Sequence, residues 1–242
     1  MNFEQVYIPT LLDYNYIVVV FILCLLFFCL YFFINAPLYY LVRFLNLKGI
    51  TKPITKKPFF KNQILFEIKQ SLWSVLIFGL YGTLIVFLYR QRFLEIGFQN
   101  NIQILLDLGI LIIWNELHFF LGHQLMHSKN LVKFHRIHHK SVVVNPFSTY
   151  SFHPLESIIM GSVMIIPLLV YPLEIWAMII FPIYHLLFNA IGHTNVAFVS
   201  KKSKSFSNSI SLRHNLHHTK FSINYGFVST LTDRLVNLFN KK

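Results

Sequence analysis

The histidines of this chain are concentrated in its C-terminal half and fall into short, repeated groups. All twelve lie from position 118 onward. The motif HxxxH occurs in HQLMH, and the motif HxxHH occurs twice, in HRIHH and HNLHH. Residues three or four apart share one face of a helix, so each group can converge on one point. These motifs contain eight histidines: His123, His127, His135, His138, His139, His214, His217 and His218.

Clustered imidazoles of this kind favour metal binding. Imidazole is the commonest metal ligand near neutral pH, and it suits zinc, copper, iron and nickel. Eight imidazoles can hold two metal ions and leave positions open for water, oxygen or substrate. One HxxHH alone is weakly specific. Two copies together with HxxxH, all beside the same predicted membrane face, favour a two-metal site over a set of packed histidines.

The other histidines differ in their surroundings. His193, in NAIGHTN, follows a long apolar region and can reach the same cluster, so we predict it as a ninth ligand. His118 lies off the helical face of His123 and is interpreted as a packed histidine or as a partner of a metal ligand. His185 lies within an apolar segment and is interpreted as a packed histidine. His153 begins HPLE and is interpreted as a helix cap or as a hydrogen-bond partner of a ligand.

One acidic residue lies within the apolar segment that leads to the first histidine motif. Glu116 is seven residues before His123, two helical turns along the same stripe. A carboxylate inside an apolar membrane helix is costly and indicates a function. We therefore expect Glu116 to accept a hydrogen bond from a ligand imidazole and to orient it.

The elements that must position these residues are predicted to be membrane helices. The chain is 55% hydrophobic and 12% charged, whereas a soluble domain carries about a quarter charged residues. Apolar runs at 14–35, at 71–89 and from 102 toward 127 are long enough to span a bilayer, which takes roughly 20 residues. The sequence predicts an all-α polytopic membrane bundle with a histidine-rich di-metal site.

A fourth apolar region covers residues 157–192 and is interrupted by prolines. Pro167, Pro172 and Pro182 divide it, and the Tyr171–Pro172 step has the character of a corner. We expect two short helices that form a hairpin, either spanning the membrane or re-entrant.

The whole chain, 1–242, is interpreted as one integral-membrane domain, with N-terminal spans in 1–101 and a histidine-box catalytic region in 102–242. Its formal net charge is +12, and the basic residues gather in 36–70, in 128–156 and after residue 200. Such clusters mark cytoplasmic loops. We therefore expect a multi-pass protein of a bacterial inner membrane or an ER-type membrane, with the metal site on the cytoplasmic side.

The ordered motifs HQLMH, HRIHH, SFHPLE, NAIGHTN and HNLHH, followed by NYGF and LTDRL, resemble the fatty acid hydroxylase/sterol desaturase superfamily over about residues 114–236. The resemblance implies oxygen-dependent hydroxylation or desaturation of a lipid C–H bond at a di-iron centre, with the eight motif histidines and His193 as ligands. Glu116 matches a position where members often carry an acid. Asn189 stands where the fatty acid 2-hydroxylase branch has a histidine, which argues against that branch.

The expected cofactors are two iron ions, with zinc possible in the purified protein. No GxGxxG dinucleotide fingerprint is present. We therefore expect a separate electron donor, such as a reductase, a ferredoxin or a cytochrome. The other expected partners are O2, a lipid substrate and the membrane, and the apolar spans exclude a nucleic-acid module.

Two other classes of function compete with the oxygenase. A zinc-dependent membrane hydrolase needs about three protein ligands and a water, fewer than are present, and no HExxH motif occurs. A non-enzymatic membrane metal transporter or binding protein would place its ligands near the membrane midplane, whereas these histidines follow or end the apolar runs. The sequence leaves open which lipid is the substrate and whether it is hydroxylated or desaturated.

Overall fold

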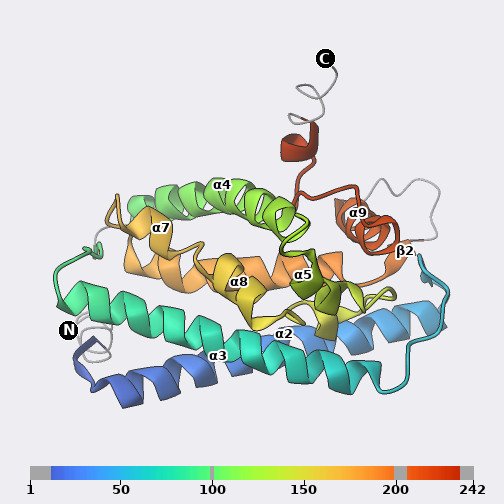
Figure 1. The fold of residues 1–242 in the computed structure, drawn as a ribbon, viewed down its shortest axis with the longest axis horizontal. Coiled ribbons are helices and arrows are strands. Elements are labelled where there is room, and N and C mark those ends of the chain that lie inside the picture. Colours follow the sequence, from blue (N-terminus) through green and yellow to red (C-terminus); the bar gives the residue numbers. More distant parts are fainter. Residues whose placement is uncertain (1–11, 99–100, 199–205, 235–242) are drawn as a thin grey trace.

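The structure is a computed structural model that describes residues 12–98, 101–198 and 206–234. Long helices dominate it, and one pair of short antiparallel strands lies at one end (Figure 1). Within these residues, four helices are long and apolar enough to cross a membrane, which confirms the predicted helical membrane bundle. These are α2 (Tyr16–Leu47), α3 (Gln63–Arg90), α4 (Asn101–Met126) and α8 (Ile175–Gly192).

Shorter elements connect the long helices or follow them. The strands β1 (Thr51–Pro53) and β2 (Val196–Phe198) pair with Thr51 opposite Phe198 and Pro53 opposite Val196. The remaining described elements are α5 (Val132–His139), the 3-10 turn η1 (Pro146–Ser148), α6 (Pro154–Gly161), α7 (Ile165–Leu168) and α9 (Phe206–Lys220).

The first two long helices extend beyond the apolar runs that predict them. α2 continues past residue 35 to Leu47, and α3 begins at Gln63 rather than near residue 71. The added part of α3, residues 63–70, mixes apolar and polar residues, and two of its polar side chains bond to the segment after α5. Gln63 donates to the Val143 carbonyl at 2.7 Å, and Ser141 and Asn145 donate to Glu67. These polar contacts join the N-terminal part of α3 to the segment after α5.

The proline-rich apolar region forms the predicted hairpin. Its first arm consists of α6 and α7, its corner lies around Pro172, and its second arm is α8. Pro182 does not interrupt the second arm as expected, because α8 runs through it. A proline in a helix interior removes one backbone hydrogen bond, and here the helix continues on both sides of that position.

The histidine-bearing segments all lie at one end of the bundle. The C-terminal ends of α2, α4 and α8 and the N-terminal end of α3 meet there, beside α5, α9 and the strand pair (Figure 1). At the other end, Gly97 donates to the Leu173 carbonyl and accepts from Ile175 N, which ties the α3–α4 connection to the start of α8.

A buried aromatic layer fixes the loop between α5 and α6 against α2 and α3. The Tyr31 hydroxyl donates to the Phe147 carbonyl at 2.7 Å, and the Ser74 hydroxyl donates to the Tyr150 carbonyl at 2.7 Å. Phe78 packs edge-on against Tyr150. Because its backbone carbonyls are bonded to two membrane-length helices, this loop is a rigid support for the residues on either side of it.

Candidate metal centre

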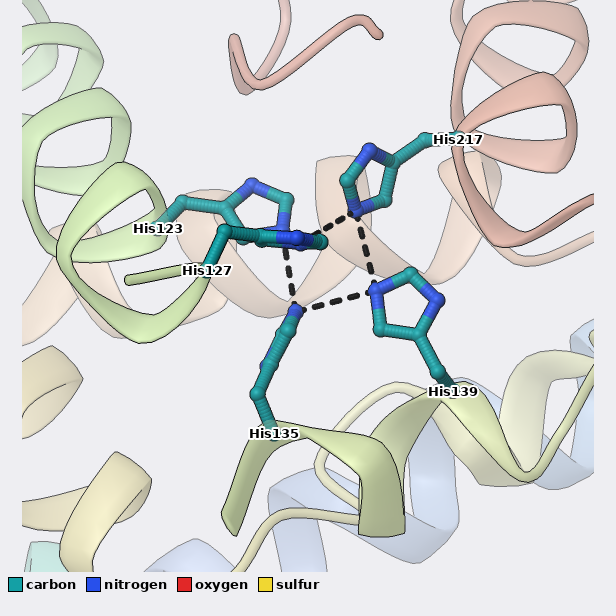
Figure 2. A group of neighbouring side chains, drawn as sticks. All are labelled: His123, His127, His135, His139 and His217. Atoms are coloured by element: carbon teal, nitrogen blue, oxygen red, sulfur yellow. Dashed lines mark hydrogen bonds between the residues drawn. The ribbon is translucent and has the colours of Figure 1, made fainter. Parts of the chain in front are cut away.

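The structure brings all nine predicted histidines together in two groups. In each group, one potential ligand atom from each residue lies within 4.8 Å of the corresponding atoms of the others. Figure 2 shows the imidazoles of the five-histidine group pointing toward one another from three segments. The five-histidine group is His123, His127, His135, His139 and His217, and the four-histidine group is His138, His193, His214 and His218.

Each HxxHH motif contributes to both groups. In α5, His135 and His139 belong to the five-histidine group and His138 to the other. In α9, His217 belongs to the five-histidine group, whereas His214 and His218 belong to the four-histidine group. Adjacent helical residues are rotated by about 100°, so a neighbouring HH pair can serve two sites that lie side by side.

In the five-histidine group, the Nε2 atoms form a continuous chain. Nε2 of His217 lies 3.2 Å from that of His127 and 3.0 Å from that of His139. Nε2 of His135 lies 3.0 Å from that of His139 and 3.2 Å from that of His123. A neutral imidazole has one donor nitrogen and one acceptor nitrogen. Four contacts along five such atoms therefore cannot all be good hydrogen bonds.

Backbone carbonyls fix the tautomers of two of these imidazoles. Nδ1 of His123 lies 3.0 Å from the Tyr225 carbonyl, and Nδ1 of His217 lies 2.7 Å from the Ile223 carbonyl. A carbonyl can only accept, so each ring donates through Nδ1 and keeps a lone pair at Nε2. Both Nε2 lone pairs are then directed into the group, as metal coordination requires.

A carboxylate orients a third imidazole. Nδ1 of His135 lies 2.8 Å from Oε1 of Glu156, and both side chains are buried. Burial raises the pKa of Glu156, whereas a cation bound by His135 would favour the ionised carboxylate. With Glu156 ionised, His135 donates through Nδ1 and also presents a lone pair at Nε2.

The donor set therefore fits a metal cation. Burial is the main cause that lowers the pKa of His127 to about 3 and that of His217 to about 4, so both rings are neutral near pH 7. Burial also lowers the pKa of His135 and His139. Neutral lone pairs that face each other at about 3 Å repel unless a cation lies among them, and neutral imidazole is the form that binds metal.

The four-histidine group is equally compact. Nε2 of His214 lies 2.8 Å from that of His193 and 3.0 Å from that of His218, and Nε2 of His218 lies 3.1 Å from that of His138. Burial lowers the pKa of all four, that of His193 to about 3. This group can hold a second metal ion beside the first.

His193 is oriented by a serine from η1. The Ser148 hydroxyl donates to the Asn145 carbonyl at 2.7 Å, and its oxygen lies 2.7 Å from Nδ1 of His193. Because the single hydroxyl proton is used on Asn145, His193 donates to Ser148 and presents Nε2 to the group. The loop held by α2 and α3 thus positions one ligand.

Glu116 does not contact a ligand imidazole, contrary to our expectation. Its carboxylate accepts hydrogen bonds from Val228 N at 3.0 Å, Ser229 N at 3.1 Å and the Ser229 hydroxyl at 2.8 Å. It holds the end of the segment that contains Ile223 and Tyr225. Glu116 thus supports the segment whose carbonyls contact His217 and His123, and the direct contact with an imidazole of the group is made by Glu156.

The three remaining histidines lie outside both groups, as interpreted from the sequence. His118 bonds to the Ser162 hydroxyl at 2.9 Å, and His185 bonds to the Tyr150 hydroxyl at 3.2 Å. His153 accepts from Leu155 N at 3.1 Å and so caps the start of α6. His153 therefore caps the helix that carries Glu156 and belongs to neither histidine group.

A small pocket faces both groups. Its volume of about 10 Å³ is roughly the space of one water molecule. Histidines of both groups line it together with Glu156, Asn189 and three apolar side chains, Phe119, Phe152 and Met160. The apolar side chains thus form part of the wall of the space between the two groups.

Several residues that orient the ligands carry weak sequence signals. Glu156 lies in the quoted SFHPLE motif, and a carboxylate in the first turn after a capping histidine could have drawn attention. The carbonyls of Ile223 and Tyr225 leave no side-chain signal at all. Ser148 is one of many serines, and only the fold places it beside His193.

Comparisons with known proteins agree with this site. The family model for fatty acid hydroxylase matches residues 108–237, more than half of the chain, and that region contains every histidine of the two groups. No solved structure matches the chain significantly.

The chain is also similar to curated sterol desaturases. It is 29% identical to the Delta(7)-sterol 5(6)-desaturase of Candida dubliniensis over 222 residues, which cover 84% of this chain and 54% of that protein. It is 26% identical to the Saccharomyces cerevisiae Delta(7)-sterol 5(6)-desaturase over 192 residues, 73% of this chain and 49% of the relative. The chain thus spans about half the length of these relatives. With its ordered histidine motifs and two histidine groups, it belongs to the fatty acid hydroxylase/sterol desaturase superfamily.

Proposed function

We propose that this chain is a membrane-bound oxidoreductase that uses O2 and external electrons to hydroxylate or desaturate a C–H bond of a lipid at a two-metal centre. The observation that carries the proposal is the pair of adjoining histidine groups, with five and four converging ring nitrogens. Membership of the superfamily and the similarity to sterol desaturases support the same class of reaction.

Iron is the metal that suits this reaction. Imidazole ligands accept both iron and zinc, but zinc has no redox chemistry. The five-histidine group would hold one iron and the four-histidine group the other. Bound iron would supply the redox chemistry with O2 by which an unactivated C–H bond is broken.

The protein groups around the metals have separate tasks. Glu156, Ser148 and the carbonyls of Ile223 and Tyr225 hold ring N–H groups, so that the opposite nitrogens face the metals. Such partners fix ring orientation and raise ligand basicity. Phe119, Phe152 and Met160 line the small pocket and limit the entry of water.

A lipid substrate would reach the metals from the membrane. A largely apolar cavity of about 320 Å³ lies among α2, α3, α6 and α8, and it is partly open. Leu26 of α2 and Ile183 of α8 line it and are 46% and 41% exposed. Both belong to helices of membrane length, so a lipid could enter between them. The names of the relatives make sterols the first class to test.

The proposed orientation places the metal centre on the cytoplasmic side, in an ER-type or bacterial inner membrane. Exposed basic residues surround that end of the bundle, among them Lys57, Lys61, Lys133, Arg136 and Lys140. Positive charge next to membrane spans favours the cytoplasmic side. The electrons would come there from a separate reductase, ferredoxin or cytochrome.

Metal analysis after anaerobic purification tests the metal centre. We expect close to two iron ions per chain, and one zinc ion per chain would contradict the oxygenase in favour of a hydrolase.

Lipid analysis of a deletion strain tests the reaction. We expect a lipid that differs by one oxygen or by two hydrogens from its wild-type counterpart, and unchanged lipids would contradict the proposal. Turnover of the purified protein with NAD(P)H alone would disprove the need for a separate donor.

A further inference from the structure

Glu67 of α3 is a buried carboxylate outside both histidine groups. Its Oε1 accepts hydrogen bonds from Nε2 of Gln63 and from the Ser141 hydroxyl, each at 2.7 Å. Its Oε2 accepts from Nδ2 of Asn145, also at 2.7 Å. Three converging donors suit an ionised carboxylate, which only accepts. Because Glu67 forms no ion pair within the described residues, these hydrogen bonds offset the cost of burying its charge.

The contacts of Asn145 fix which side of its amide faces Glu67. Oδ1 of Asn145 accepts from Phe147 N at 3.0 Å. A backbone N–H can only donate, so the amide oxygen must face Phe147 and the NH2 group must face Glu67. The carboxylate therefore sets the position of Asn145, the residue that begins the 3-10 turn η1.

Asn145 in turn holds the Ser148 hydroxyl through both of its backbone groups. The hydroxyl donates to the Asn145 carbonyl at 2.7 Å, and its oxygen accepts from Asn145 N at 3.2 Å. The same oxygen lies 2.7 Å from Nδ1 of His193. A hydroxyl has one proton and two lone pairs, so these contacts use all three when His193 donates. A buried chain of hydrogen bonds thus leads from Glu67 through Asn145 and Ser148 to His193.

We propose that Glu67 is a positioning residue for the four-histidine group, and that it acts through Asn145 and Ser148 to direct Nε2 of His193 at the metal. This inference rests on the proposed two-metal centre and assigns the four-histidine group an orienting carboxylate of its own. Hydrogen bonds in a buried chain polarise one another. The negative charge of Glu67 therefore also makes the imidazole of His193 a stronger ligand.

Glu67→Gln breaks this chain at one contact. The new amide oxygen can keep the hydrogen bonds from Gln63 and Ser141, whereas the new NH2 group then faces the NH2 group of Asn145. The opposite orientation would lose two hydrogen bonds instead of one. The exchange Glu67→Gln/Asn145→Asp restores a donor and an acceptor at this contact and keeps the total charge. The exchanged carboxylate can still accept from Phe147 N.

Zinc binding to variants that keep one histidine group intact tests this inference. His217→Ala leaves the four-histidine group complete, and His193→Ala leaves the five-histidine group complete. The Kd for Zn²⁺ is measured in each by competition with a chelator, with and without Glu67→Gln. We expect Glu67→Gln to raise the Kd about tenfold in the His217→Ala protein. It should leave the Kd unchanged in the His193→Ala protein, because the residue at which the chain ends is already absent there.

The exchange Glu67→Gln/Asn145→Asp should restore the lower Kd in the His217→Ala protein. Ser71→Ala is the matched control, since Ser71 is buried one turn from Glu67 and donates to the Phe147 carbonyl at 3.3 Å, outside the chain. It should change neither Kd. If melting shows that Glu67→Gln is unfolded, the exchange and Ser148→Ala carry the test, and Ser148→Ala should weaken the four-histidine group alone.

An unchanged Kd of Glu67→Gln in the His217→Ala protein, equal weakening of both groups, or no recovery in the exchange would overturn the inference. A global effect on the fold would weaken both groups, so the selective loss separates positioning from stability. Zinc binding needs no turnover. The expected pattern in a protein that oxidises no lipid would therefore contradict the oxygenase and leave this inference standing.

Discussion

Glu156 on α6 accepts a hydrogen bond from Nδ1 of His135 on α5 at 2.8 Å, and each side chain is 1% exposed. Within the part of the chain that the structure describes, the second carboxylate oxygen has no hydrogen-bond partner. A buried carboxylate is expensive unless it meets positive charge or donors. The pair is therefore best suited to a state in which His135 binds a cation and Glu156 balances part of its charge.

Removal of this carboxylate should weaken metal binding. Partners that orient a metal-bound histidine typically contribute 10- to 100-fold in metal affinity. We expect Glu156→Ala to lose metal during dialysis against a weak chelator, with an affinity reduced by about 10- to 100-fold. Metal content per chain, measured by mass spectrometry, checks this. Glu95→Gln, at an exposed carboxylate near the far end of α3, should retain the wild-type content.

The two histidine groups should lose their metals separately. His217→Ala removes a nitrogen that contacts two others in the five-histidine group, whereas His193→Ala removes one from the four-histidine group. Each variant should retain about one metal per chain rather than two. His118→Gln changes an imidazole outside both groups and should retain both metals. Complete retention of metal in both alanine variants would contradict the two-site assignment.

The metals should also stabilise the fold. The groups join α4, α5, α8 and α9, so a bound ion links segments that are distant in sequence. A ligand that binds only the folded state at 100 times its Kd adds about 2.7 kcal/mol to the free energy of unfolding. Chelation should therefore lower the melting temperature in detergent by several degrees, and added Fe²⁺ under anaerobic conditions should restore it. An unchanged melting temperature would show that no metal is bound at these groups.

Site residues could be predicted from the sequence where their side-chain type and their spacing along one helix identify them. His135 and His139 are four apart, and helical geometry is enough to bring them together. His193 was predicted from its place after an apolar segment and from the family resemblance, and in the fold its Nε2 lies 2.8 Å from Nε2 of His214. The all-α bundle could be predicted from the apolar runs, because each is long enough to span a bilayer as a helix.

The contacts that orient the ligands could not be predicted in this way. Glu116 shares a helical stripe with His123, yet its carboxylate bonds to Val228 N and Ser229 N from a segment more than 100 residues away. Spacing within one helix says nothing about which distant backbone N–H groups approach it. Likewise, the carbonyl of Tyr225 has no sequence signature, because every residue carries the same group.

Glu116 should therefore stabilise a segment rather than a metal ligand directly. Glu116→Ala removes the acceptor for three hydrogen bonds at residues 228 and 229. We expect faster amide hydrogen exchange over residues 223–229, together with about tenfold weaker metal binding, because the carbonyls that hold His123 and His217 lose their support. Glu116→Gln keeps an acceptor oxygen and should lie between the wild type and Glu116→Ala. Unchanged exchange in Glu116→Ala would contradict this role.

Met160 separates the apolar cavity from the pocket among the histidines, and its size should decide whether a substrate reaches the metals. It is 5% exposed and packs against Gly122, where an added Cβ would lie 3.3 Å from its methyl carbon. Methionine is unbranched and flexible, so its side chain can move aside for a lipid. Tryptophan at this position would fill the passage with a rigid ring.

We therefore expect Met160→Trp to lower the turnover of lipid by about 100-fold, because the reacting carbon is kept from its position. Its metal content should remain close to that of the wild type, since Met160 belongs to neither histidine group. Met164→Trp is the matched control, because Met164 lines the cavity but not the small pocket. It should weaken lipid binding with less effect on the turnover of bound lipid. Single-turnover oxidation of prebound lipid measures turnover separately from lipid binding. Equal rates in Met160→Trp and Met164→Trp would exclude Met160 as the barrier.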